Sequence, residues 1–311
     1  MSESKSSSQD NSPDTRSDSD HHKVTATEKV TAESPSTDGS APSSSAKQLP
    51  VPSSTVDLPK IGGVPVCRGN DGNTYIRVKD TKHASVLQVG TRPADLFIRR
   101  LAQQQGNRLT RKEIQDINDD LIAYAELSGQ TCNVWYRVAP FEDGIELDVG
   151  DDQHTRIRVT PGKVEVITEG SETLFYRPPT MQPLTMPAEH GDLKLLDRYL
   201  NNLREPDRVL LKGWISFTLA HPKVPTTNYP FLILRGDQGS GKSSLSKLIL
   251  SMIDPSIVDV QTFPSKKNDL AIALQNSHAL CYDNMRNIKP LMSDTLAIAS
   301  SGGALTSRQL Y

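Results

Sequence analysis

The pattern of apolar and polar residues divides the 311-residue chain into a polar tail and a folded remainder. Residues 1–60 are rich in Ser, Thr, Asp and Pro and contain few large apolar residues, so they bury too little surface to offset the entropy lost on ordering. Apolar residues then recur at helical spacing over residues 94–105 and 111–127, and Thr110 with Glu113 forms a capping-box pattern before the second run. We therefore expect a disordered tail over residues 1–60, followed by two helices.

Residues 133–177 change to the two-residue alternation that is typical of half-buried strands. Turn residues separate the alternating segments, which favours consecutive antiparallel strands, a β-meander. A proline-rich connector follows at residues 178–187 and marks a domain boundary. We therefore expect a small α+β domain over residues 61–185. The four alternating segments are residues 134–138, 145–149, 157–159 and 164–167.

Beyond the connector, helical patterns alternate with short unbroken apolar runs. Helical spacing predicts an αα-hairpin over residues 192–203 and 206–220. A short unbroken apolar run is the signature of a strand buried on both faces, and such strands belong to parallel sheets covered by helices. The pattern predicts an α/β fold of the P-loop NTPase type, a parallel sheet with flanking helices, over residues 186–311. The apolar runs are residues 231–234, 257–261 and 278–282, and further helices are expected at residues 269–275 and 291–301.

The run at residues 231–234 leads into a glycine-rich turn that fits the phosphate-binding pattern G-x-x-x-x-G-K-[ST], the Walker A motif. Glycines allow positive φ, so that successive N–H groups point at phosphate oxygens, and the helix that follows adds its unpaired N-terminal N–H groups. Lys242 is expected to reach the β and γ phosphates, and the Ser243 hydroxyl to ligate Mg²⁺. The predicted nucleotide-binding residues are Gly236, Asp237, Gln238, Gly239, Ser240, Gly241, Lys242, Ser243 and Ser244.

A second chemical element lies one strand and one helix farther along the chain. Asp283 stands at the carboxyl end of the apolar run at residues 278–282, where ligands of open α/β sheets bind. A P-loop needs such an acid to complete the magnesium shell, so we expect Ser243 and Asp283 to hold the metal. The predicted catalytic residues are Lys242, Asp283 and Asn284. Many ATPases place a Glu after this Asp as the general base, whereas this chain has Asn284, and the base is unassigned.

Net charge and cysteine usage limit the other classes of function. The formal net charge of −2 argues against a polybasic nucleic-acid binder, so any such contact needs a local patch. The three cysteines, Cys67, Cys132 and Cys281, lack metal-ligand spacing and suit a reducing cytosol, so we expect packing residues and no disulfide. No apolar run approaches the ~18 residues of a membrane helix, and no secretion signal begins the chain, which favours a cytoplasmic protein without membrane contact.

Three separated motifs give the chain a resemblance to a known family. The stretches PFLILRGDQGSGKSS, CYDN and LMSDTLAIASSGGALTSRQLY occur in this order after the strand-like VWYRVAPFEDGIELDVGDD. Together they resemble the prophage-type ATP-binding proteins related to superfamily-3 helicases and phage primase-helicases, over roughly residues 90–311. The resemblance implies ATP and Mg²⁺ as ligands, single-stranded DNA as a partner with Arg308 as a contact, and a homo-oligomer.

Members of that family continue beyond the Leu-Tyr pair into a strand with a polar sensor Asn and then arginines that act between subunits, whereas this sequence ends at Tyr311. We therefore expect a chain that is incomplete at its C-terminus and that binds nucleotide even where turnover needs the missing part. The leading hypothesis is a phage or prophage replication-type ATPase that couples ATP-Mg²⁺ to single-stranded DNA. The alternatives are a P-loop kinase of a small molecule and a non-catalytic nucleotide-binding or interaction protein.

Overall fold

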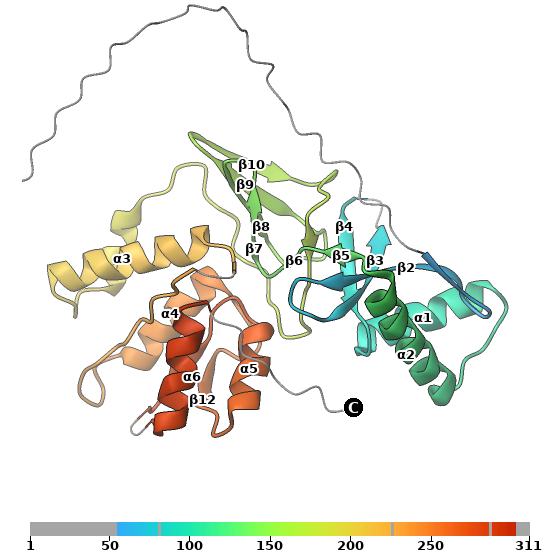
Figure 1. The fold of residues 1–311 in the computed structure, drawn as a ribbon. Coiled ribbons are helices and arrows are strands. Elements are labelled where there is room, and N and C mark those ends of the chain that lie inside the picture. The colour runs from blue at the N-terminus through green and yellow to red at the C-terminus, as the bar shows by residue number, and fades with distance from the viewer. Residues whose placement is uncertain (1–54, 80–81, 225–226, 286–287, 303–311) are drawn as a thin grey trace, which may run out of the picture. The chain divides into compact units, whose positions relative to one another are not determined.

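The computed structural model describes residues 55–79, 82–224, 227–285 and 288–302 (Figure 1). Its first elements are β1 (Thr55–Leu58), β2 (Gly62–Gly69), β3 (Thr74–Lys79), β4 (Ala84–Gln88), α1 (Arg92–Gln104), α2 (Arg111–Ser128) and β5 (Thr131–Cys132). Strands β1 to β4 are antiparallel neighbours in chain order, and β5 pairs parallel with β2. Apolar side chains of the sheet and of both helices, among them Val64, Ile76, Ile98 and Leu121, form one buried core. The two helices thus cover one face of a five-stranded sheet.

The second helix starts at the residue that the capping-box pattern predicts. The Thr110 hydroxyl accepts a hydrogen bond from the Glu113 N–H, and the Glu113 carboxylate accepts one from the Thr110 N–H. The helix ends at Gly129, whose φ of 65° lies in the left-handed region that glycine adopts without strain. The predicted capping box is confirmed.

The polar tail is shorter than its composition suggests. Strand β1 lies inside the segment predicted to be disordered, and its side chains Val56 and Leu58 pack against the core of the first sheet. Two apolar side chains at alternate positions are enough for an edge strand that pairs with β2. Residues 1–54 lie outside the described residues.

The expectation for two of the cysteines is wrong, because Cys67 and Cys132 form a disulfide. Cys67 is on β2 and Cys132 on β5, and the parallel pairing of these strands brings their Cα atoms to 5.9 Å. This separation suits a disulfide bond. The two cysteines are 65 positions apart in the sequence, so no local pattern indicated their pairing. Cys281 is a free thiol and partly buried.

A four-stranded antiparallel meander occupies the region where the sequence alternates. Its strands are β7 (Val138–Phe141), β8 (Gly144–Asp148), β9 (Arg156–Thr160) and β10 (Lys163–Ile167), each paired with the next. The predicted strand at residues 134–138 is divided, because Arg137 has a φ of 54° and breaks the extended backbone. Its first part, β6 (Val134–Trp135), pairs parallel with β11 (Leu174–Phe175).

The C-terminal region contains the 3₁₀ helix η1 (Leu193–Tyr199) and the helices α3 (Glu205–Ala220), α4 (Lys242–Ile253), α5 (Lys267–Gln275) and α6 (Pro290–Ser300). Two short strands, β12 (Val260–Thr262) and β13 (Cys281–Asp283), pair parallel to each other. Figure 1 shows α4, α5 and α6 gathered around β12. The core of this region joins α3 to α4 through buried Leu211, Ile215, Ile249 and Ile253.

Two predicted elements of this region differ in the structure. The first helix of the predicted hairpin is the short η1, because Leu193 and Tyr199 stay exposed and the segment has no full apolar stripe to bury. Residues 231–234 belong to no strand or helix among the described residues. Phe231 and Ile233 are 51% and 68% exposed, whereas Leu232 and Leu234 pack against the core of α3 and α4. The predicted burial of this segment on both faces is therefore wrong.

Within the described ranges, every helix is too short or too polar to span a lipid bilayer.

Candidate functional site

The glycine-rich turn ends where α4 begins. Gly239 and Gly241 both have a φ of 82°, in the left-handed region, and Gly241 is the N-cap of α4. Because glycine has no side chain to cap the helix, the first N–H groups of α4 receive no side-chain hydrogen bond from their cap. Such N–H groups, together with the positive end of the helix dipole, favour an anion.

The first residue of α4, Lys242, folds back over the turn. Its ammonium donates hydrogen bonds to the carbonyl of Gly236 at 2.8 Å, the carbonyl of Asp237 at 2.6 Å and the Ser240 hydroxyl at 3.3 Å. The side chain is partly exposed and makes these contacts with the loop's own acceptors. The lysine charge therefore lies over the turn, where a bound phosphate would compete with the carbonyls for it.

The next residue, Ser243, contacts the second predicted element directly. The Ser243 hydroxyl donates to Oδ2 of Asp283 at 2.8 Å, although the two residues are 40 positions apart in the sequence. The other carboxylate oxygen accepts the N–H of Asn284 at 2.7 Å. The Ser243 hydrogen bond is the main cause of a lowered pKa of Asp283; the Asn284 N–H and the charge of Lys242 add to it, whereas partial burial opposes it. The carboxylate therefore stays ionised at neutral pH.

The strand pair positions Asp283 at the loop. Asp283 is the last residue of β13 and pairs in register with Thr262, the last residue of β12, so both strands end at the same edge. At the opposite end of β12, just before the strand begins, Asp259 forms an ion pair with Lys247 of α4 at 2.9 Å. After Asp283 the backbone turns sharply, because Asn284 has a φ of 57°. Asn is one of the few residues that adopt this conformation readily, and such backbone outliers are frequent at functional sites.

A cavity of about 550 Å³ lies at the carboxyl ends of β12 and β13. Asp283 and Asn284 form one side of it, and Phe263 and Met292 are among its apolar walls. The amide of Gln261 and the ammonium of Lys289 add polar groups. A cavity of this size and mixed lining is in the range of small-molecule sites.

The oxygens of Ser243 and Asp283 suit a hard divalent cation. Mg²⁺ prefers oxygen ligands, keeps several waters and is usually held by one or two protein groups together with phosphates. Within the part of the chain that the structure describes, no three His, Cys, Asp or Glu residues cluster as a metal site. A hydroxyl and one carboxylate beside a phosphate-binding loop therefore fit Mg²⁺ with nucleotide better than a metal that needs a full protein cage.

The structure brings together most of the residues that the sequence singles out. The loop from Gly236 to Ser244 and Asp283 share one surface through the Ser243 contact, and Asn284 borders the cavity next to it. Arg308 lies outside the described residues.

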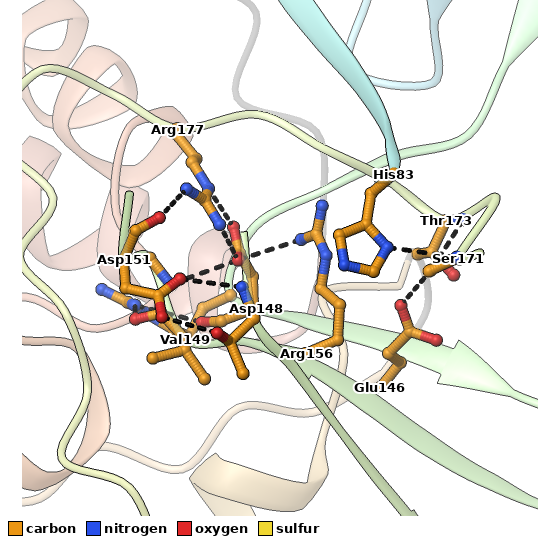
Figure 2. A network of polar contacts seen from close by, with 12 residues as sticks. His83, Glu146, Asp148, Val149, Asp151, Arg156, Ser171, Thr173 and Arg177 are labelled. Atoms are coloured by element: carbon orange, nitrogen blue, oxygen red, sulfur yellow. Dashed lines mark hydrogen bonds and ion pairs between the residues drawn. The ribbon is translucent and has the colours of Figure 1, made fainter. Parts of the chain in front are cut away.

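A second polar cluster, which the sequence did not indicate, is buried beside the meander (Figure 2). Asp148 of β8 is fully buried and pairs with Arg156 at 3.0 Å and with Arg177 at 2.5 Å. Burial opposes ionisation of Asp148, but the hydrogen bond from Arg177 and the charge of Arg156 outweigh it and lower the pKa. Glu146, on the same strand and also fully buried, pairs with Arg158 at 2.7 Å and accepts the Ser171 hydroxyl.

Each charged side chain of the buried cluster forms an ion pair with another member of the cluster, which distinguishes the cluster from a binding site with an unpaired charge. Asp151, in the turn after β8, accepts hydrogen bonds from the Thr155 N–H at 2.8 Å and the Thr155 hydroxyl at 2.6 Å. The acidic residues of this turn therefore organise the hairpin between β8 and β9. We refer to Glu146, Asp148, Arg156, Arg158 and Arg177 as the buried ion cluster.

A glycine-rich loop that ends at a helix N-terminus, with a hydroxyl and a carboxylate beside it, is an arrangement typical of phosphate sites with a divalent cation. Residues 195–311, which contain the whole of this arrangement, match the family model of the actinomycete integrative conjugative element replication protein. No curated protein and no solved structure matches the chain. The family match supports a replication-related role for this protein.

Proposed function

We propose that the chain binds ATP with Mg²⁺ at the loop from Gly236 to Ser244 and Asp283, as part of a replication ATPase of the P-loop class that works on single-stranded DNA. The observation that carries the proposal is the hydrogen bond of 2.8 Å between the Ser243 hydroxyl and the Asp283 carboxylate. Ser243 belongs to the phosphate-binding pattern, and Asp283 was expected to complete its metal shell because it is an acid at the end of an apolar run. Their contact is what a shared metal site requires.

Each residue has a task that follows from its position. The N–H groups of the turn and of the first turn of α4 would cradle the phosphates, since they lie at the positive end of the helix dipole. The Lys242 ammonium would exchange its contacts with the Gly236 and Asp237 carbonyls for phosphate oxygens. Ser243 and Asp283 would hold Mg²⁺, which when bound neutralises phosphate charge.

The family match supplies the replication context, and the resemblance to helicase-type ATPases supplies the DNA partner. DNA-stimulated ATP turnover distinguishes a replication ATPase from a protein that binds nucleotide without hydrolysing it. In the proposed function, single-stranded DNA raises the rate of ATP hydrolysis, and the DNA affinity falls steeply with salt because phosphate contacts release counterions.

The test compares Lys242→Ala with Lys247→Ala on the same helix. Lys247 pairs with Asp259 at the surface and lies away from the turn, so its replacement is a matched loss of one positive charge. We expect Lys242→Ala to lower ATP affinity by at least about tenfold, because charge-assisted phosphate contacts are strong, and Lys247→Ala to change it by less than about twofold. Equal ATP affinity of the wild-type chain and Lys242→Ala would refute the proposed site.

The cavity beside Asp283 favours one alternative, phosphoryl transfer to a small molecule. A kinase needs an acceptor site within reach of the γ-phosphate, and the cavity shares Asp283 and Asn284 with the proposed metal site. A kinase of this kind would turn over ATP without DNA once its acceptor is supplied. ATP hydrolysis measured with and without single-stranded DNA therefore distinguishes the two functions.

A further inference from the structure

One buried carboxylate holds the far ends of both elements that meet at the proposed site. Asp254 is the C-cap of α4, the helix that begins with Lys242 and Ser243. Its Oδ2 atom accepts the N–H groups of His278 at 2.7 Å and Ala279 at 3.1 Å, just before β13 begins. Asp254 thus joins the end of the P-loop helix to the start of the strand that carries Asp283.

The other carboxylate oxygen of Asp254 accepts a hydrogen bond from Arg137. The Arg137 Nε donates to Oδ1 of Asp254 at 3.0 Å, and both side chains are buried. Arg137 is the residue with positive φ that separates β6 from β7. The ion pair therefore connects the meander with the P-loop region inside one compact unit, residues 51–311.

The rest of the Arg137 guanidinium is saturated by backbone carbonyls. Nη1 donates to Asp148 at 3.2 Å and Val149 at 2.9 Å, and Nη2 donates to Gln182 at 3.0 Å and Pro255 at 3.3 Å. The five N–H donors of a guanidinium stand in a fixed planar fork, so they fix the relative positions of the groups that accept them. Arg137 therefore fixes the end of β8, the proline-rich connector and the turn after α4 against each other.

Asp254 is faced by three titratable side chains, those of Arg137, Lys223 and His278. Arg137 and Lys223 are cations, and the Lys223 ammonium donates to the carbonyls of Leu274, at 2.7 Å, and Ser277. Burial lowers the pKa of Lys223 to about 8, against the opposing charge of Asp254. Burial and the Lys223 charge lower the pKa of His278 to about 4, so His278 is neutral at pH 7, and its Nε2–H lies 2.8 Å from the Thr218 carbonyl.

We propose that Arg137 and Asp254 are positioning residues for the metal site, through which the meander sets the distance between Ser243 on α4 and Asp283 on β13. The inference rests on the proposed function, because only a metal shared by these two residues makes their spacing matter. Because α4 is a rigid helix, a shift of its C-cap also moves its N-terminus. Because β13 begins two residues after Ala279, a shift of His278 and Ala279 also moves Asp283. Loss of the buried pair frees both elements to shift.

The experiment uses the full chain with Arg137→Lys and Asp254→Asn, and Arg158→Lys as the matched control. Arg137→Lys keeps the buried charge but lacks the fork that reaches five acceptors. Arg158 makes an ion pair of similar length with Glu146 in the same meander, on a strand that pairs with neither α4 nor β13. Should Asp254→Asn not fold, Arg137→Lys decides the question, because it leaves no buried charge without a partner.

The first measurement needs no nucleotide. Hydrogen exchange of residues 278–284 should become at least about tenfold faster in Arg137→Lys and Asp254→Asn, because the amides of His278 and Ala279 lose or weaken their carboxylate acceptor. Arg158→Lys should exchange like the wild type in this segment. Unchanged exchange in both test variants would overturn the positioning role, whatever the chain binds.

The second measurement is the magnesium gain, defined as the ratio of ATP affinity in Mg²⁺ to ATP affinity in EDTA. We expect the gain to fall about tenfold in the two test variants, as for other residues that support metal ligands, while affinity in EDTA changes by less than about twofold. Faster exchange with an unchanged gain would make the pair purely structural and overturn the proposal. A wild-type chain without any magnesium gain would instead refute the proposed function, and the exchange result would still report whether the pair holds β13.

Discussion

The glycine-rich loop before α4 and the buried ion cluster use charged residues in opposite ways. At the loop, Lys242 is partly exposed and donates to nearby acceptors of the loop itself. In the cluster, Asp148 and Arg156 are fully buried and pair across two strands. The Lys242 ammonium can exchange its carbonyl partners for a ligand, whereas the charges of the buried ion cluster stabilise the fold by pairing with each other.

The difference teaches which charges are available for binding. A buried carboxylate that has lost its water is stable only while its cations stay in place, so it cannot also serve a ligand. An exposed cation held by carbonyls loses little when a phosphate replaces them. The comparison therefore supports the proposal of nucleotide binding at the loop and a stabilising role for the cluster, and the variants below test this division.

The largest expected effect is on stability, from Asp148→Asn. This change leaves Arg156 buried without its ion pair, and breaking one partner of a buried pair typically destabilises a protein by about 3–5 kcal/mol. Chemical denaturation of the full chain measures the loss. Glu165→Gln is the control in the same sheet, because Glu165 pairs with Lys163 at the exposed surface and should contribute less than about 1 kcal/mol. Similar losses for both variants would remove the distinction between buried and exposed pairs.

His278, just before β13, is a buried titratable residue of the C-terminal region, and its protonation should affect stability. Its folded-state pKa of about 4 lies below the ordinary value of 6.5, so the unfolded chain takes up the proton first as the pH falls. Stability therefore decreases from pH 6.5 toward pH 4, at most by about 1.4 kcal/mol per pH unit. Between pH 6.5 and pH 5 the wild type should lose about 2 kcal/mol relative to His278→Gln. Gln keeps a donor for Thr218, whose carbonyl lies 2.8 Å from His278 Nε2.

The control for the pH effect is His190→Gln, because His190 is exposed in the connector region. Its stability should follow the wild-type curve over the whole pH range. Parallel curves for the wild type and His278→Gln would show that His278 is protonated as easily in the folded chain as in the unfolded one.

The sequence could predict features that depend on neighbours in the chain. The capping box of Thr110 and Glu113 and the P-loop turn each need only a few consecutive residues, because their hydrogen bonds are local. Asp283 was predictable because the end of an apolar run marks one edge of a sheet. The strand alternation likewise located three of the four meander strands, β8, β9 and β10, but not β7, which follows the break at Arg137.

The features that sequence reasoning missed depend on pairs far apart in the chain. Arg137 and Asp254 are 117 residues apart, and Cys67 and Cys132 are 65 apart. Nothing in an isolated Arg or Asp indicates whether it will be exposed or buried, since that depends on which strands later become neighbours. The burial of Asp148 was not predictable for the same reason, because its cations come from β9 and from beyond β11.

Asp283→Asn should have a smaller effect on stability and a specific effect on the metal. The carboxylate is partly exposed and its partner Ser243 can also hydrogen-bond to an amide, so unfolding free energy should change by less than about 1 kcal/mol. The magnesium gain should fall about tenfold or more, which equals about 1.4 kcal/mol of binding free energy. Isothermal titration with ATP in Mg²⁺ and in EDTA measures it. A normal magnesium gain would exclude Asp283 from the metal site.

The smallest expected effect on stability is that of a substitution in the segment at residues 231–234. Ile233 is 68% exposed, so Ile233→Thr should change the unfolding free energy by less than about 0.5 kcal/mol. Leu232 packs against the core of α3 and α4, and Leu232→Thr should cost about 2 kcal/mol or more. A strand buried on both faces would instead make the two losses alike. A loss above about 2 kcal/mol for Ile233→Thr would therefore mean that another part of the chain, or a second copy, covers this face in solution.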